Sequence, residues 1–423
     1  MYNALDYGII GDGKTNNTKN INLLLEKIKD TGGTVYFPPG EYLTGSILMY
    51  GNTTLFIDSG ARLSATDNFD EFPYIANDGI EDFNIKRHRG FISSFGCENI
   101  TICGRGEIDG NGRKWWKSGK SDIERPRLIN FIMCKNVQIK DVTLKNSPCW
   151  TVHPVCCENV TVNSVTVQNP YDSPNTDGIN PESCKNVRIS DCHIDVGDDC
   201  ITIKSGTETD TLQKRFPCEN VTVSNCTMSH GHGGVVIGSE MSGGIKNIVI
   251  SNCVFQNTDR GIRIKTRRER GGYIDGILVG NIIMDKVKAA ITVNEFYWCG
   301  APKDSKNLFD EHCMPVTDKT PEISNISING IIARNVEASG IYMYGLPERN
   351  ISGITINNAD ISVTGCREGF ESVLAYNRPL SFGEGIFMEN VKDTCLNNIK
   401  ISCGGEKLTV KNCTNVTLNG KNI

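Results

Sequence analysis

Four short polar clusters hold the residues of this chain that could do chemistry. They begin at Asn175 (NTDGIN), Gly197 (GDDC), Ser229 (SHGHGG) and Gly261 (GIRIKTRRERGG). Their order is carboxylate, carboxylate pair, imidazole and basic group, with 22 to 32 residues between successive starts. Cleavage of a glycosidic bond needs a protonated carboxyl group for the leaving oxygen and an ionised carboxylate for water. The clusters therefore predict acid and base chemistry on a sugar.

The carboxylates of the first two clusters are Asp177, Asp198 and Asp199. Mutual repulsion between close carboxylates helps to keep one of them protonated near neutral pH. Adjacent residues on a regular strand face opposite ways, so Asp198 and Asp199 would normally diverge. If both carboxylates serve one site, the chain cannot be a regular strand here. We therefore expect a bend at Gly197 that turns both carboxylates into one cleft.

An imidazole and a pair of cations follow the carboxylates along the chain. His230 and His232 can hold a proton and tune a neighbouring carboxyl group. The alternation Arg263–Ile264–Lys265 places both cations on one face of a strand. Because a guanidinium fork matches a carboxylate, the two cations predict a substrate that carries its own carboxylate.

The elements that position these clusters form a repeat. Motifs such as CKNVRISDC, from Cys184, recur with their Asn residues 23 to 34 positions apart between residues 136 and 247. Short alternating runs without a helical period predict the stacked coils of a parallel β-helix, in which clusters one coil apart converge. The Asn fits a stacked turn, where its side chain can bond to neighbouring backbone. The repeated Asn residues are Asn99, Asn136, Asn159, Asn186, Asn220, Asn247 and Asn415.

Taken alone, each cluster also has a simpler interpretation. Adjacent Asp residues are common in solvated turns, and His in a Gly-rich turn is commonly structural. Alternating Arg and Lys are common on an exposed strand, and clustered carboxylates could bind Ca²⁺. The spacing of one cluster per coil is what favours a joint functional site.

The cysteines follow the same repeat. Nine of the 18 occupy two repeat positions, either two residues before the repeated Asn or six residues after it. Small, soft Cys packs well in a narrow core, so most are predicted to be buried free thiols. Free thiols favour a reducing compartment, and the first residues show no signal-peptide pattern, so a cytoplasmic location is expected.

A stack of coils needs covered ends. Residues 14–33 carry apolar side chains at helical spacing and end in two glycines, which predicts an amphipathic helix that caps the N-terminal end. The helix would bury Ile21, Leu24, Leu25 and Ile28.

We predict an all-β chain with a single β-helix domain over residues 1–423. Residues 1–45 or so would form the cap and first strands, and about 96–423 the repeated coils. Less regular stretches at about 66–92, 298–322 and 366–385 are predicted loops. Because the net charge is −5, we predict no nucleic-acid partner. Because no apolar run reaches 18 residues, we predict no membrane partner. The sequence leaves the oligomeric state open.

The four clusters together resemble the signature of the polygalacturonases, family twenty-eight of the glycoside hydrolases. The signature NTDG, GDD, GHG and RIK stands at Asn175–Gly178, Gly197–Asp199, Gly231–Gly233 and Arg263–Lys265. The segments GRGEIDGNGRKWW, NSPCWTVHP and VVIGSEMSGG also resemble bacterial members, so the likeness covers nearly the whole chain. It implies a right-handed parallel β-helix and hydrolysis with inversion, without a cofactor or a metal.

The resemblance also implies roles, residue by residue. Asp198 matches the general acid, and Asp177 and Asp199 match the residues that position and deprotonate water. His232 lies within GHG and would tune the protonation of the acid, whereas His230 precedes that motif. The implied substrate-binding residues are Asn175, Arg263, Lys265 and Tyr297.

The leading hypothesis is an exo-acting hydrolase of α-1,4-galacturonosyl linkages in pectic oligosaccharides. Trp150 and His153 are expected to help close one end of the cleft. A hydrolase of the same family that acts on rhamnogalacturonan or another sugar is the main alternative. A Ca²⁺-dependent polysaccharide lyase and a non-catalytic carbohydrate-binding solenoid are the others.

Overall fold

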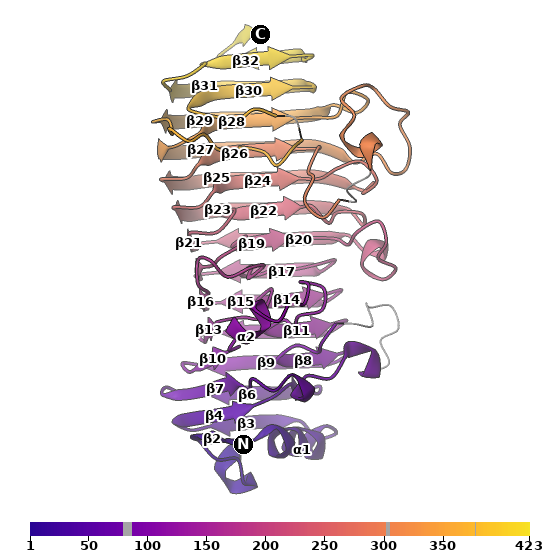
Figure 1. Cartoon of the computed structure of the whole chain (residues 1–423), viewed down its shortest axis with the longest axis vertical. Helices are drawn as coiled ribbons and strands as arrows, with labels where there is room; N and C mark the ends of the chain where they lie inside the picture. The colour runs from indigo at the N-terminus through magenta and orange to yellow at the C-terminus, as the bar shows by residue number, and fades with distance from the viewer. Residues whose placement is uncertain (79–86, 302–304, 377) are drawn as a thin grey trace. The chain divides into compact units, whose positions relative to one another are not determined.

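The computed structural model describes residues 1–78, 87–301, 305–376 and 378–423. Its contacts divide the chain into two compact units. The N-terminal unit comprises Met1–Asp199 with Asp210–Leu212, and the C-terminal unit comprises Cys200–Thr209 with Gln213–Ile423. Parallel strands dominate both units (Figure 1), which confirms the all-β, parallel β-helix prediction. That the chain forms a single domain stays a prediction.

The N-terminal unit contains three rows of parallel strands, each strand paired with the equivalent strand of the next coil. The first row is β1 (Tyr2–Asn3), β3 (Gly33–Phe37), β6 (Thr53–Ile57), β9 (Glu98–Gly104), β12 (Lys135–Lys140), β15 (Glu158–Asn163) and β17 (Lys185–Ser190). The second is β2 (Asp12–Asn16), β4 (Gly40–Thr44), β7 (Ala61–Ala65), β10 (Glu107–Asp109), β13 (Thr143–Lys145), β16 (Thr166–Gln168) and β18 (His193–Asp195). The third is β5 (Ile47–Leu48), β8 (Ile92–Phe95), β11 (Ile129–Ile132) and β14 (Val152–Val155).

The C-terminal unit stacks in the same way but has two rows of strands. In one row, two short strands are followed by single long strands that span the positions of both. This row is β20 (Cys218–Ser224) and β21 (Thr227–Ser229), then β23 (Ile245–Gln256), β25 (Tyr273–Asp285), β27 (Glu322–Val336), β29 (Ile351–Val363), β31 (Val391–Ser402) and β33 (Thr414–Leu418), with antiparallel β34 (Lys421–Asn422). The other row is β19 (Ile201–Ile203), β22 (Val235–Gly238), β24 (Arg260–Lys265), β26 (Ala289–Asn294), β28 (Ser339–Tyr344), β30 (Glu384–Glu389) and β32 (Leu408–Lys411).

Helical segments are short. They are α1 (Thr18–Ile28), α2 (Arg113–Trp116), and the 3-10 turns η1 (Ala4–Tyr7), η2 (Phe69–Glu71), η3 (Ile75–Asp78), η4 (Gln213–Arg215) and η5 (Lys306–Phe309). No helix in the described part of the chain is long and apolar enough to cross a membrane. The three predicted loops are confirmed as stretches without regular strands, although residues 79–86, 302–304 and 377 of these loops lie outside the described residues.

Register makes like residues stack in the core. In the N-terminal unit, Ile100 pairs with Val137, Val137 with Val160, and Val160 with Val187. All four side chains are buried. Because strand side chains alternate between the two faces, every second residue of the motif faces inward. The short apolar alternation in the sequence therefore specifies the register of each coil.

The repeated Asn residues stack in ladders near the starts of successive strands. Asn136 donates from Nδ2 to Oδ1 of Asn99 at 3.0 Å, and Asn159 and Asn186 continue the ladder with bonds of 3.1 Å. Each has a left-handed backbone with φ between 54° and 59°, which Asn tolerates better than most residues. The predicted stacking is confirmed in this ladder, but the residues lie at the starts of strands and not in separate turns, and these side-chain bonds join each Asn to the Asn of the preceding coil.

All 18 cysteines lie in the described residues, and each is a free thiol. Ten are buried, which agrees with the predicted packing role. Successive cysteines stack, since the backbone N–H of Cys134 lies 3.4 Å from Sγ of Cys157, as does that of Cys157 from Sγ of Cys184. Burial raises the pKa of the Cys157 thiol well above its usual value.

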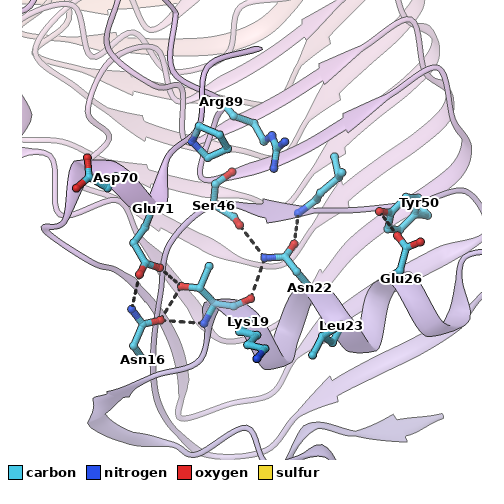
Figure 2. A pocket seen from close by; sticks show the side chains of 13 residues that line it. Asn16, Lys19, Asn22, Leu23, Glu26, Ser46, Tyr50, Asp70, Glu71 and Arg89 are labelled. Atoms are coloured by element: carbon cyan, nitrogen blue, oxygen red, sulfur yellow. Dashed lines mark hydrogen bonds between the residues drawn. The ribbon is translucent and has the colours of Figure 1, made fainter. Parts of the chain in front are cut away.

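Helix α1 buries the four apolar residues expected of it. Its Asn22 side chain satisfies the backbone of β5 (Figure 2), since Nδ2 donates to the Ser46 carbonyl and Oδ1 accepts from the Leu48 N–H, both at 2.9 Å. Nearby, Tyr50 donates to Glu26. The helix is therefore where the sequence placed it, and its role as an end cap stays a prediction.

Candidate active site

The coils of the N-terminal unit bring Asp177 and Asp199 to adjacent levels. Asp177 follows β16, and Asp199 follows β18. The Thr151 N–H donates to the Asp177 carbonyl at 2.8 Å, and the Gly178 N–H donates to the Asp199 carbonyl at 3.0 Å. Successive coils are thus in register at this turn, as the spacing of the first two clusters predicted.

The three predicted carboxylates converge. One carboxylate oxygen from each of Asp177, Asp198 and Asp199 lies within 4.8 Å of the others. Asp177 and Asp199 are buried, whereas Asp198 is half-buried. Carboxyl groups this close together can divide the roles of acid and base in the hydrolysis of a glycosidic bond. The same oxygens are also near enough together to hold a cation.

Local bonds orient two of these carboxylates. Asp198 accepts the backbone N–H of Asp199 at Oδ1, at 2.8 Å. Asn180, which is buried in the first cluster, donates from Nδ2 to Oδ2 of Asp177 at 3.1 Å. The backbone at Gly197 packs so closely that a Cβ there would lie 2.5 Å from the Ser173 carbonyl oxygen. Glycine therefore permits the turn that brings both adjacent carboxylates into one cluster.

Asn175 lies beside this cluster in the sequence, and its side chain is already engaged. Arg125, which is buried, donates to Oδ1 of Asn175 at 2.5 Å and to the carbonyls of Pro148 and Pro174. Arg125 belongs to no motif and lies 50 residues before its partner. The sequence therefore offered no signal for it, although it fixes the loop that carries Asn175.

His153 does not take the expected position in a cleft. Its side chain is fully buried, and Nε2 lies 2.8 Å from Oε2 of Glu182. Trp150 packs edge-on against His153 and receives the guanidinium of Arg127 at 4.4 Å from its ring centre. The full burial of His153 contradicts the expectation that it helps to close the cleft, whereas Trp150 is half-buried and its part in that expectation stays a prediction.

In the C-terminal unit, the Gly-rich turn directly precedes β22, and it is bonded to the residues at the starts of β19 and β24, the two strands that flank β22 in its row. The Cys200 N–H donates to the Gly233 carbonyl at 2.9 Å, and the Gly234 N–H donates to the Arg260 carbonyl at 2.9 Å. His232 is exposed on this turn, whereas His230 is half-buried and has a left-handed backbone. The structure thus presents His232 to a ligand more openly than His230.

The predicted basic pair and Tyr297 come together in the same unit. Arg263 and Lys265 lie on β24, with their charged ends 5.6 and 5.0 Å from the ring centre of Tyr297. All three residues are largely buried, and Ile264 between the cations faces the core. Cations beside an aromatic face in a sheltered site bind a carboxylate more strongly than they would in water.

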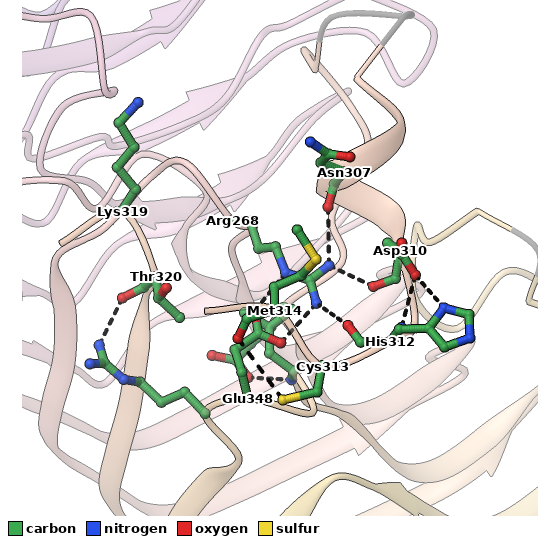
Figure 3. Close-up of polar contacts among 12 residues, drawn as sticks. Arg268, Asn307, Asp310, His312, Cys313, Met314, Lys319, Thr320 and Glu348 are labelled. Atoms are coloured by element: carbon green, nitrogen blue, oxygen red, sulfur yellow. Dashed lines mark hydrogen bonds and ion pairs between the residues drawn. The ribbon is translucent and has the colours of Figure 1, made fainter. Parts of the chain in front are cut away.

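The later arginines of the fourth cluster have other partners. Arg268 forms a two-bond ion pair with Glu348, at 2.6 and 2.8 Å, and donates to the carbonyls of Asn307, Asp310 and His312 (Figure 3). It is a structural residue that holds the loop around η5. Arg267 and Arg270 instead share one carboxylate, that of Glu208.

The structure therefore assembles the predicted residues in two groups, each within one unit. The carboxylates of the N-terminal unit can donate and accept protons, and the cations and tyrosine of the C-terminal unit can hold an anionic ligand. That both groups and His232 serve one reaction stays a prediction.

Comparison with known proteins shows which family the chain resembles. The profile of glycosyl hydrolases family 28 matches residues 58–371. A probable polygalacturonase of Vitis vinifera is 35% identical over 370 residues, covering 84% of this chain and 73% of that protein. A hyperthermoactive exopolygalacturonase of Thermotoga maritima matches with a TM-score of 0.73 and 27% identity, over 93% of this chain and 91% of its own. The family 28 exopolygalacturonase of Yersinia enterocolitica matches 100% of this chain and 78% of its own, at a TM-score of 0.81 and 22% identity, and shares the fold.

Proposed function

The chain belongs to glycosyl hydrolases family 28, and we propose that it hydrolyses α-1,4-galacturonosyl linkages of pectin-derived galacturonan. We further propose that it inverts the anomeric configuration and removes single units from one end of short oligosaccharides. The convergence of Asp177, Asp198 and Asp199 carries the catalytic part of this proposal. Relatives that bear the name polygalacturonase support the substrate, and the exopolygalacturonase of Thermotoga maritima supports the exo mode, although relatives named endo-polygalacturonase match as well.

The proposed reaction uses the three carboxyl groups in different protonation states. Asp198 donates its proton to the glycosidic oxygen while the bond to the leaving sugar breaks. Asp177 and Asp199 hold a water molecule and take its proton, so that its oxygen bonds to the anomeric carbon from the opposite face. One water is added across each bond, and proton exchange with solvent returns a proton to Asp198 and removes the proton that the base carboxylate took from water. Its partial exposure suits contact with a substrate oxygen.

Arg263 and Lys265 are proposed to bind the carboxylate of the galacturonate unit at the bond that breaks. A guanidinium offers two parallel hydrogen bonds, and the ammonium adds a second positive charge. Tyr297 holds both cations against its ring. A methyl-esterified or neutral sugar would lack the carboxylate that these two cations are proposed to bind, so we expect it to be a poor substrate.

The oxygen spacing does not by itself favour inversion. Carboxyl groups roughly 6.5–9.5 Å apart are typical of inverting enzymes, whereas the nearest oxygens here lie within 4.8 Å. Inversion is therefore proposed from the family resemblance, and the anomer of the first product, read by NMR before mutarotation, tests it directly.

The deciding experiment follows the products of a defined galacturonate oligomer by chromatography. We expect monomer to accumulate from the start, with and without a chelator. Asp198→Asn should lower kcat at least ~100-fold, the usual range for loss of a general acid, while the fold stays intact. Asp30→Asn, which makes the same chemical change at an exposed position of the N-terminal unit, is the matched control.

Other product patterns would redirect the proposal. A spread of shorter oligomers would indicate endo action. Products that absorb in the near ultraviolet and require Ca²⁺ would indicate a lyase. Cleavage of rhamnogalacturonan fragments alone would indicate another substrate within the family. Undiminished turnover by Asp198→Asn would overturn the assignment of the acid.

A further inference from the structure

Two buried arginines of the C-terminal unit share a single carboxylate. Arg267 and Arg270 follow β24, and their side chains are only 2% and 5% exposed. Nη2 of Arg267 lies 3.2 Å from Oε1 of Glu208, and Nη1 of Arg270 is paired with the other oxygen of the same group. Two buried guanidinium groups therefore face one anion, and Glu208 itself is 31% exposed.

These arginines are incompletely satisfied. Nε and Nη1 of Arg267 and Nε of Arg270 are buried and have no hydrogen-bond partner among the described residues. Buried polar atoms are normally paired, and a buried charge without enough partners is costly. Burial and the neighbouring Arg270 cation together lower the pKa of the Arg267 guanidinium. The site thus has more capacity to bind an anion than Glu208 uses.

A neighbouring ion pair shows the contrast. Lys204 donates to Oε2 of Glu240 at 2.8 Å, so one cation there meets one carboxylate. Burial would raise the pKa of Glu240, but Lys204 and then Arg270 lower it overall. Glu240 is therefore a second anion near Arg267 and Arg270, but its hydrogen bond goes to Lys204, and Nε and Nη1 of Arg267 and Nε of Arg270 stay without a hydrogen-bond partner in the described part of the chain.

The two arginines adjoin the basic pair already assigned to the substrate. Arg267 forms an antiparallel bridge with Phe296, and the Tyr297 N–H donates to the Thr266 carbonyl at 3.0 Å. Backbone bonds therefore fix the segment that carries Arg267 directly beside Tyr297. A chain of uronate units bound at Lys265 would present a further carboxylate close to this segment.

We propose that Arg267 and Arg270 form a second carboxylate subsite, which Glu208 of the same chain fills when no long substrate is bound. The carboxylate of a further galacturonate unit displaces Glu208 when an oligosaccharide long enough to reach the two arginines binds. This inference rests on the proposed function, because it assigns a second part of the same polyanionic substrate.

The exchange costs little electrostatic free energy because one carboxylate replaces another. The buried guanidinium groups keep an anion throughout, so no bare charge is created. Glu208 lies in a partly exposed segment and can return to water, where its charge is well solvated. Gly206, two residues earlier, has a φ of 71° and lies at the start of this segment, which gives the chain a turn that other residues rarely adopt.

The test compares two substrates, digalacturonate and trigalacturonate, in the whole protein. In Glu208→Gln the competing charge is gone, so we expect the ratio of KM for the trimer to KM for the dimer to fall about 5-fold to 10-fold. In Arg270→Gln the ratio should rise by a similar factor. Asp360→Asn removes a carboxylate that is paired with Arg334 on the surface of the same unit, and should leave the ratio unchanged.

Calorimetry with trigalacturonate separates this inference from the proposed function. It is run on Asp198→Asn and on Asp198→Asn/Glu208→Gln, so that binding is measured without hydrolysis. Tighter binding by the double variant supports the second subsite. Wild-type hydrolysis together with equal or weaker binding by the double variant would overturn the subsite and leave the proposed function standing. Failure of the wild type to hydrolyse either oligomer, with no binding in either variant, would overturn both.

Discussion

At the scale of single residues, Glu295 is a carboxyl group in an apolar environment outside the proposed catalytic set. It follows β26 and is fully buried. Oε2 accepts the Leu346 N–H at 2.9 Å, while Oε1 has no hydrogen-bond partner in the described part of the chain. Burial raises its pKa to about 8, against the opposing Leu346 hydrogen bond. Of the facing charges, Glu348 raises this pKa further, and Arg268 and Arg349 lower it.

This pKa predicts a pH-dependent stability. The folded state holds the proton of Glu295 up to about pH 8, whereas the unfolded chain releases it near 4.5. The folded state therefore binds more protons in that window, and its free energy of unfolding falls as pH rises from about 4.5 to about 8. Glu295→Gln, which carries no such proton, should lose less stability over this range than the wild type does.

Urea denaturation at pH 5 and pH 8.5 measures this difference. Glu368→Gln, an exposed carboxyl group of the same unit, is the control and should behave as the wild type. Since Glu295 lies two residues before Tyr297, we also expect KM to rise in the alkaline range more steeply in the wild type than in Glu295→Gln. Parallel stability curves for all three proteins would show that Glu295 does not titrate in this window.

At the scale of elements, the asparagine ladders join successive coils of the solenoid. Asn159 illustrates the two contributions that such a residue makes. Its side chain donates to Asn136 and accepts from Asn186, and its backbone has a φ of 57°. An exposed hydrogen bond contributes about 0.5–1.5 kcal/mol, and a left-handed conformation costs a residue with a Cβ about 1–2 kcal/mol.

Substitutions at Asn159 separate these two contributions. Asn159→Ala loses both bonds and keeps the strained backbone, so the free energy of unfolding should fall by about 2 kcal/mol or more. Asn159→Gly also loses the bonds, but glycine adopts positive φ freely, and the loss should be closer to 1 kcal/mol. Equal losses in the two variants, measured by chemical denaturation, would mean that backbone conformation is unimportant at this turn.

The elements also show what could and could not be predicted from the sequence. The carboxylate cluster was predictable because Asp177 and Asp199 lie one coil apart, and strand pairing fixes that register. Arg125 was not, because a loop returns it to Asn175 from an earlier coil and no periodicity specifies where a loop returns. The hydrogen-bond partner of each ladder Asn could not be predicted for a related reason. The motif indicates a special backbone position, but not which atom of the preceding coil lies next to the side chain.

At the scale of the whole molecule, the cysteines link the fold to its environment. Stacked coils leave a narrow core, and ten of the 18 thiols fill it as small apolar groups. A secreted protein with this many cysteines would be expected to carry disulfides, whereas all 18 thiols here are free. We therefore propose that all 18 cysteines stay reduced thiols in the working protein, so that packing and not covalent linkage stabilises the core.

Thiol chemistry on the native protein tests this proposal. A thiol reagent should modify the three exposed residues Cys299, Cys313 and Cys395 first, and all 18 only after denaturation. Burial raises the pKa of core thiols such as Cys103 and Cys149, so little reactive thiolate forms there. A reductant should leave the melting temperature unchanged, and a triple Cys→Ser variant at the exposed positions should show none of the rapid labelling. A melting temperature that falls on reduction would reveal a stabilising disulfide and would contradict this proposal.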